Sequence, residues 1–102
     1  VSVHHMPGHT PGLQSVRVNT KRGPVVLASD AAHYYESITH GTPFMTHESQ
    51  FLMLEGFRRL RKLAPSDQHI VPGHDPIVLQ RYPAASPELE GIVARLDLAP
   101  SE

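Results

Sequence analysis

The pattern of apolar and polar positions predicts three strands in the first third of the chain. Residues 1–5 are partly β-branched, which favours a short strand. Residues 14–20 alternate, with both valines on one face, so we expect a strand buried on that face. Residues 25–29 form a continuous apolar run, typical of a strand covered on both faces. The short turn at residues 21–24 predicts that the last two strands form an antiparallel hairpin.

The middle of the chain predicts a long loop and then one amphipathic helix. Residues 33–44 have no clear period and predict a loop, a kind of segment that often carries function. Residues 47–63 predict the helix, with Thr46 as N-cap and Pro65 as the stop. Its apolar side chains recur every three residues. They are Phe51, Leu54, Phe57, Leu60 and Leu63.

Three short elements are expected in the last third of the chain. Residues 69–71 predict a short strand, and residues 92–98 predict a final strand. Between them, Ser86 is the expected cap of one helical turn that extends through Glu90. Strands alternate with one clear helix, and this order predicts an α/β or α+β fold.

Composition and charge narrow the classes of function. The chain has 102 residues, a net charge of −1 and no cysteine. This length suits one small domain, and the mixed charges favour neither a nucleic-acid nor a membrane partner. The lack of cysteine excludes disulfides and thiolate metal sites and suits an intracellular setting, so we expect cytoplasmic localisation. Eight histidines are many for a chain of this size.

Three short stretches carry the candidate chemistry. HMPGHTPG at residues 5–12 cannot be helical, because its Pro and Gly residues impose a tight, irregular turn. ASDA at residues 28–31 and VPGHDP at residues 71–76 each lie at the end of an apolar run. Ligand sites in α/β sheets gather at such strand ends. The candidate metal ligands are His9, Asp30 and His74.

Two imidazoles and a carboxylate suit zinc, and also iron, cobalt or manganese. The two oxygens of Asp30 can in addition bridge two cations about 3.5–4 Å apart. The alternative interpretation is structural, with His9 and His74 capping turns and Asp30 bonding loop amides. The metal interpretation requires the three side chains to converge, with their metal-binding atoms within about 4–7 Å of one another.

These stretches resemble the downstream metal motifs of the metallo-β-lactamase superfamily. VLASDAAHYYE at residues 26–36 and VPGHDP at residues 71–76 are closest to the N-acyl-homoserine lactonase family. The similarity extends from His4 to about Pro83. The resemblance implies a four-layer αββα sandwich. We expect residues 1–102 to be a single partial domain, the C-terminal half of that sandwich, with the N-terminal half absent.

The resemblance also implies a site with two divalent metal ions, zinc being the expected metal. In it His9 would ligate one metal, Asp30 would bridge both and His74 would ligate the other. The superfamily's upstream His-x-His-x-Asp-His motif has no counterpart here, so further ligands are expected outside this chain. The lactonases usually have a Tyr three residues after the bridging Asp, where this chain has His33 followed by Tyr34. The candidate catalytic residues are therefore Asp30, His33 and Tyr34, and we expect His33 or Tyr34, not both, to face the metals.

The implied activity is metal-dependent hydrolysis. The resemblance implies the opening of an acyl-homoserine lactone (quorum quenching), or of a related lactone or ester, by a metal-bridging hydroxide. Rival hydrolases are a glyoxalase-II-like thioesterase and a β-lactamase. A rival of another class is a non-catalytic, truncated or degenerate relative that binds metal weakly. The expected partner is a small-molecule lactone or ester, with homodimerisation as the expected form of self-association. We expect the chain alone to be inactive and to bind zinc poorly.

Other residues have structural expectations. His5 is expected to bond a loop carbonyl, His69 to pack at a strand edge, and Asp75 to orient His74. Three glycines are expected to supply backbone angles that other residues resist. They are Gly8, Gly12 and Gly73. Three large apolar side chains are expected in the core, with an acyl pocket as the alternative. They are Phe44, Met45 and Phe51.

Overall fold

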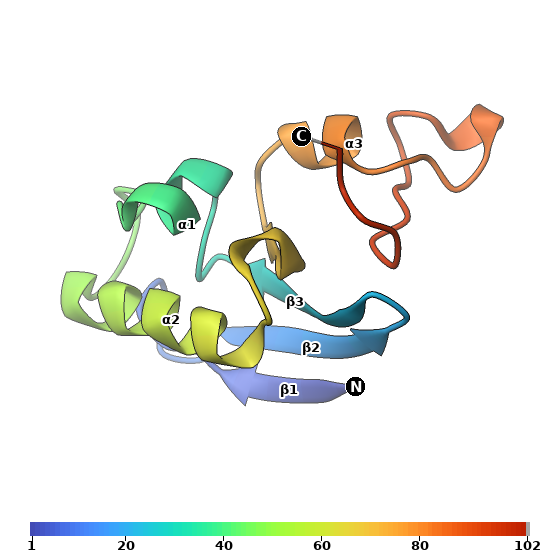
Figure 1. Ribbon diagram of the computed structural model, residues 1–102. Helices are drawn as coiled ribbons and strands as arrows, with labels where there is room; N and C mark the ends of the chain where they lie inside the picture. Colours follow the sequence, from blue (N-terminus) through green and yellow to red (C-terminus); the bar gives the residue numbers. More distant parts are fainter. Residues whose placement is uncertain (102) are drawn as a thin grey trace.

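The computed structural model describes residues 1–101, which are organised around one four-stranded sheet (Figure 1). Strands β1 (Ser2–His5), β2 (Gln14–Thr20) and β3 (Gly23–Ser29) pair antiparallel in sequence order. Strand β4 (Ile70–Pro72) adds to β3 in parallel. The three predicted N-terminal strands and their hairpin are therefore confirmed.

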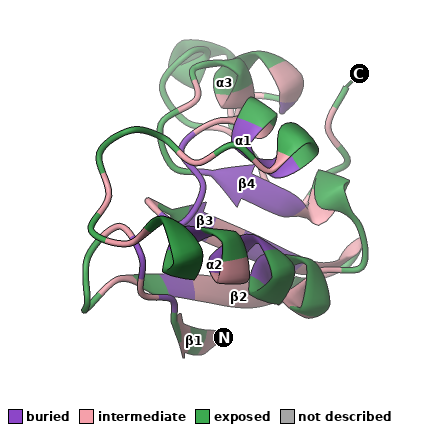
Figure 2. Cartoon of the chain, turned by 90° about the vertical axis from the view of Figure 1, so that its left-hand side faces the viewer, coloured by how far each residue is buried: buried purple, intermediate pink, exposed green. Residues whose placement is uncertain are grey.

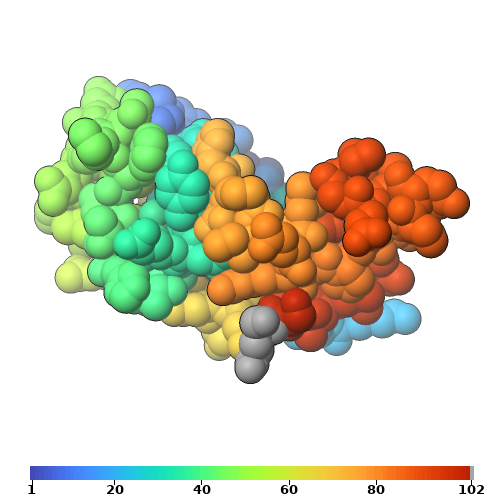
Figure 3. Space-filling view, turned by 90° about the horizontal axis from the view of Figure 1, so that it is seen from above, coloured from blue at the N-terminus to red at the C-terminus, as the bar shows by residue number. Residues whose placement is uncertain are grey.

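In residues 1–101, three α-helices and two 3₁₀ turns accompany the sheet. They are α1 (Tyr35–His40), α2 (Gln50–Leu63), α3 (Ile77–Arg81), η1 (Asp67–His69) and η2 (Pro87–Leu89). Within the described residues, none of the helices has both the length and the apolar character needed to cross a membrane. The segment around η2 protrudes from the rest of the molecule (Figure 3).

The core has two parts, one on each face of the sheet. Residues of α2 and α1 pack on one face against alternate side chains of β3, such as Val26 and Ala28. On the other face Val25 and Val71 pack against Tyr82, which follows α3. Strand β4 is buried along its whole length (Figure 2). The apolar run of β3 is covered on both faces, as predicted.

Strand β2 buries a different face from the one predicted. Its fully buried side chain is Ser15, whose hydroxyl donates a hydrogen bond to the Ala28 carbonyl at 2.9 Å. The predicted apolar face, with Val16 and Val18, is only half-buried. The alternation of side chains is correct, but a small hydroxyl with a main-chain acceptor fits the tighter side of the sheet.

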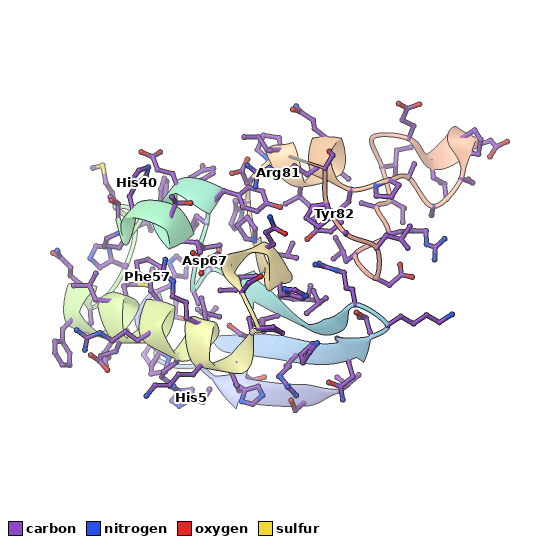
Figure 4. All side chains as sticks on the ribbon, in the orientation of Figure 1. His5, His40, Phe57, Asp67, Arg81 and Tyr82 are labelled. Carbon is purple, nitrogen blue, oxygen red and sulfur yellow. The ribbon has the colours of Figure 1, made fainter. Side chains whose placement is uncertain are left out.

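Helix α2 begins three residues later than the predicted start. Its N-cap is Ser49 instead of Thr46, and the Ser49 hydroxyl accepts a hydrogen bond from the Leu52 N–H. The buried residues of the helix are Met53, Gly56, Phe57 and Leu60. These residues follow the i, i+3, i+4, i+7 pattern of one helix face. The predicted set with a period of three residues does not stay on one face of the helix, and its first member, Phe51, is 71% exposed. Figure 4 shows Phe57 projecting from α2 on the side of α1.

Two other predicted elements are wrong. The predicted loop contains α1, whose first N–H (Tyr35) donates to the Asp75 carboxylate, an acceptor distant in sequence. The predicted final strand at residues 92–98 forms only one bridge, between Ala84 and Ala94. Ala94 and Leu96 of this segment pack against the core on one face of the sheet, whereas the β-branched Ile92 and Val93 are largely exposed. The segment joins none of the four paired strands in the described residues.

Replacing Leu60 with Ala is expected to destabilise the fold by about 2–5 kcal/mol, the usual cost of a cavity left by a buried leucine. Leu60 is fully buried between α2 and the sheet. The matched control is Leu54→Ala on the same helix, where the side chain is 40% exposed and a loss below about 1 kcal/mol is expected. Urea unfolding of both variants measures the difference, and equal losses would contradict the assigned core face.

Candidate metal centre

Side chains from separate parts of the chain converge where β3 and β4 end. Parallel pairing of these strands places their carboxyl ends together. Asp30 follows β3 directly, and His74 follows β4 after one residue, Gly73. The loop after β1 adds a histidine, and the segments on either side of α1 add the rest. The residues that line the resulting open depression are His9, Asp30, His33, Tyr34, Phe44, Thr46 and His74.

The two strand ends approach each other closely because residue 73 is a glycine. A Cβ at Gly73 would lie 2.6 Å from the Ser29 carbonyl oxygen, closer than any side chain tolerates. The expectation of an unusual backbone angle at Gly73 was wrong, since its φ lies outside the left-handed region. Main-chain hydrogen bonds continue the contact, from the Gly73 N–H to the Ala32 carbonyl and from the His74 N–H to the His33 carbonyl, both at 2.9 Å.

The turn that carries the first ligand candidate depends on Gly8 and His5. Gly8 has a φ of 150°, and a Cβ there would lie 2.8 Å from the Met53 amide nitrogen, so the expectation for this glycine is confirmed. The His5 Nε2 lies 2.6 Å from the Pro11 carbonyl oxygen, which confirms its predicted structural role. Gly12 has neither a left-handed φ nor a close neighbour, so the expectation for Gly12 was wrong.

The His9 ring is oriented by a main-chain acceptor. Its Nδ1 lies 2.6 Å from the Thr46 carbonyl oxygen and donates to it. The proton is therefore on Nδ1, and Nε2 presents its lone pair, which is the arrangement that metal-binding histidines adopt. The structural alternative is correct in one respect, because His9 does bond a loop carbonyl. This bond leaves the Nε2 of His9 available for a metal.

Asp30 is the centre of the cluster. Its Oδ1 lies 2.5 Å from the His74 Nε2 and 3.3 Å from the His33 Nε2. Ligand atoms of His9, Asp30 and His33 all lie within 4.8 Å of one another. All three predicted ligands therefore line one depression, but the compact group contains His33 where the sequence predicted His74. The assignment of each as a ligand stays a prediction.

Burial lowers the pKa of the His33 imidazole. The ring is 5% exposed, and burial lowers its pKa more than the neighbouring Asp30 carboxylate raises it. The adjacent His9 and His74 rings lower the pKa further. A neutral imidazole is the form that binds a metal. The His33 Nδ1 is buried without a hydrogen-bond partner among residues 1–101.

Tyr34 also lines the depression beside His33, and the expectation that only one of the two faces the metals stays a prediction. The two differ in depth, because His33 is buried and Tyr34 is half-buried at the rim. Phe44 lies over both rings, with its centroid 4.7 Å from that of His33 and 5.7 Å from that of Tyr34. The prediction of a core position was wrong for three large apolar side chains. Phe44 lines the site, and Met45 and Phe51 are largely exposed.

Asp75 does not orient His74 in the described structure. Its Oδ2 accepts a hydrogen bond from the Tyr35 N–H and its Oδ1 from the Ile77 N–H, both at 3.0 Å, so it caps α1 and α3. His69 packs as predicted, with its Nδ1 on the Ser66 hydroxyl and its Nε2 on a carbonyl of the hairpin turn. The contribution of Thr46 had no sequence signal, because its carbonyl approaches the site through the fold alone. Phe44 lines the site, in agreement with the alternative expectation of a pocket residue.

Comparison with known proteins points to one group of enzymes. No known family model matches the sequence. Over 77 residues, 74% of the chain, it is 40% identical to an N-acyl homoserine lactonase of Bacillus sp and 36% identical to an N-acyl homoserine lactonase of Bacillus cereus. The chain spans 30% of the length of these curated relatives.

Solved structures agree with the sequence comparison. A quorum-quenching N-acyl homoserine lactone hydrolase matches with a TM-score of 0.62 and 32% identity, over 72% of this chain and 31% of that one. A second structure of such a hydrolase, with the product N-hexanoyl-L-homoserine bound at its catalytic metal center, matches with the same TM-score and identity, over 72% of this chain and 30% of its own. These neighbours have the metallo-β-lactamase fold, so the predicted mixed α/β class is confirmed.

Proposed function

Because this chain is related to the N-acyl homoserine lactonases over about three quarters of its length, we propose that the protein containing it is a metal-dependent hydrolase that opens N-acyl homoserine lactones. The observation that carries the proposal is the convergence of His9, Asp30, His33 and His74 at the ends of β3 and β4. This cluster lies within a chain that matches lactonase structures.

The residues of the cluster fit divalent metal ions, for which zinc is our proposed identity and two our proposed number. His9 and Asp30 would hold one cation, and Asp30 and His74 the other. The fit rests on the donor set, since imidazole nitrogens and a carboxylate suit zinc, and on the His9 ring, whose Nε2 is left free by the bond from Nδ1 to Thr46. When bound, such a metal pair supplies a Lewis acid and lowers the pKa of water.

The surrounding side chains suit the opening of an acylated lactone. Tyr34 stands at the half-exposed rim, where its hydroxyl can donate to the substrate carbonyl oxygen or to the departing alkoxide. Phe44 presents a partly exposed apolar face beside it, suited to contact with an acyl chain. The buried His33 ring and Phe44 exclude water from one side of the depression.

Replacing Tyr34 with Phe is expected to lower kcat about 10- to 1,000-fold, the range for one positioned proton donor, with metal content unchanged. Steady-state kinetics of lactone opening, with metal analysis of the same sample, makes the measurement. Tyr35→Phe is the matched control, because Tyr35 does not line the depression and its hydroxyl is buried without a hydrogen-bond partner in the described residues. Unaltered kinetics in Tyr34→Phe would remove this hydroxyl from the mechanism.

The proposed activity is tested by supplying the full-length protein that contains this chain with an N-acyl homoserine lactone, a thioester and a β-lactam. We expect ring opening of the lactone, loss of that activity on treatment with a chelator, and recovery with zinc. Preference for the thioester favours a glyoxalase-II-like enzyme, and preference for the β-lactam favours a β-lactamase. No turnover of any of the three, with metal bound, favours a non-catalytic relative.

A further inference from the structure

We propose that His33 is itself a metal ligand, and that His9, Asp30 and His33 form a three-ligand cation site within this chain. The inference rests on the proposed function, because it assigns one more residue to the same site. Ligand atoms of the three residues lie within 4.8 Å of one another. Three protein ligands with an open position for water are the usual set of a catalytic zinc ion.

The spacing within the group suits a shared cation. Two ligand atoms bound to one zinc ion at tetrahedral angles are about 3.4 Å apart, given metal–ligand bonds of about 2.1 Å. The His33 Nε2 and the Asp30 Oδ1 are 3.3 Å apart. This pair therefore already has the separation of two ligands of one ion, and the ligand atom of His9 lies within 4.8 Å of both.

The His33 ring is fixed in direction by the rings around it. Its centroid lies 4.7 Å from that of Phe44, 5.2 Å from that of His74 in a stacked arrangement, and 5.1 Å from that of His9 in an edge-on arrangement. The ring is almost fully buried, with Nε2 toward Asp30. Little side-chain entropy remains to be lost when a cation binds, which favours ligation.

The imidazoles of His9 and His33 differ in whether the second ring nitrogen has a hydrogen-bond acceptor. The Nδ1 of His9 donates to the Thr46 carbonyl, whereas the Nδ1 of His33 has no acceptor among residues 1–101. A hydrogen bond at the second nitrogen strengthens an imidazole ligand, and its loss costs about 10- to 100-fold in metal affinity. His9 is therefore the stronger ligand and His33 the weaker. His33→Gln should weaken metal binding less than His9→Gln does.

The decisive experiment detects the bond directly. The full-length protein is labelled with ¹⁵N-histidine and loaded with ¹¹³Cd, whose nuclear spin couples only to the nuclei of directly bound ligands. We expect cadmium coupling on the Nε2 of His33 as well as on that of His9, with the His33 signal assigned by its loss in His33→Gln. Coupling on His9 without coupling on His33 would overturn the inference while leaving the proposed metal site intact.

Zinc affinity provides the second readout. Competition with a chelating indicator should show at least about a 10-fold loss in His33→Gln. The matched control is His40→Gln, because His40 is an exposed residue at the end of α1 (Figure 4) that does not line the depression, and no change is expected there. Circular dichroism establishes that each variant is folded, and should His33→Gln not fold, the cadmium coupling of the parent protein decides. Equal affinity of a folded His33→Gln and the parent would contradict the inference, whatever the lactone activity.

Discussion

Asp30→Asn is expected to reduce both metal affinity and lactone turnover further than any other single change in this chain. The Oδ1 of Asp30 contacts the Nε2 of His74 and of His33, so one oxygen joins two imidazoles. An amide has the same shape but no negative charge, and its nitrogen repels a cation. Metal affinity should fall by more than about 100-fold. Loss of a residue that only hydrogen-bonds to a metal ligand already costs about 10- to 100-fold in affinity, and Asp30 is itself an expected ligand.

Turnover by Asp30→Asn should fall by about 1,000-fold or more, since removal of one electrostatic donor already costs about 10²- to 10³-fold in kcat. The measurement combines metal analysis with lactone kinetics at saturating zinc. Asp97→Asn is the matched control, because Asp97 is an exposed carboxylate paired with Arg95 outside the cluster. Near-normal zinc content and turnover in Asp30→Asn would show that Asp30 only bonds neighbouring groups, as in the structural alternative.

Gly73→Ala is expected to destabilise the fold by about 3 kcal/mol or more, at or beyond the upper end of the usual range for an overpacked site. The added methyl group would lie 2.6 Å from the Ser29 carbonyl oxygen and 2.7 Å from its carbon. These are backbone atoms of β3, which cannot rotate away as a side chain would. The strand ends must therefore separate, and His74 would move away from Asp30 as they do.

Urea unfolding measures this loss, and zinc titration of the folded fraction measures the effect on the site. Gly12→Ala is the matched control, because nothing lies within 4 Å of a Cβ at Gly12 and its φ is not in the left-handed region. We expect a change within about 0.5 kcal/mol there. A stability of Gly73→Ala equal to that of Gly12→Ala would mean that the β3–β4 contact is looser than described.

The strands of the N-terminal hairpin could be predicted because their signal is local. Alternation at residues 14–20 and the apolar run at residues 25–29 follow from the geometry of a pleated strand, whatever the rest of the chain does. The buried face of β2 could not be predicted in the same way. Which side of a strand is tighter depends on what packs there, and Ser15 has a main-chain acceptor that only the neighbouring strand supplies.

Helix α1 could not be predicted because its stabilising contact is remote. Its first N–H is capped by Asp75, which belongs to the other side of the site. The start of α2 was misplaced for a related reason, since the Thr46 carbonyl is engaged by His9 and helix formation begins only after Ser49. Caps supplied from a distance leave no pattern in the adjacent residues.

The candidate metal ligands could be identified from the sequence because each lies in a tight turn or just after an apolar strand. The structure places His9, Asp30 and His74 around one depression. The place of His33 in the compact group of ligand atoms could not be derived from the spacing of residues along the sequence. Its approach to Asp30 depends on the turn that follows β3, where Ser29 has a φ of 52°, rare for a residue other than glycine. Backbone angles of this kind leave no signal in the spacing of the histidines along the sequence.

The hydrogen bonds from the Gly73 N–H to the Ala32 carbonyl and from the His74 N–H to the His33 carbonyl involve no side-chain atoms. The two loops that carry the cluster are therefore joined by groups that every residue except proline possesses. Mutation at position 33 or 34 can replace the chemistry of the side chain while the backbone beneath it keeps its place. Such a scaffold is evolvable, because the side chains at positions 33 and 34 can change without breaking the contact between the two loops.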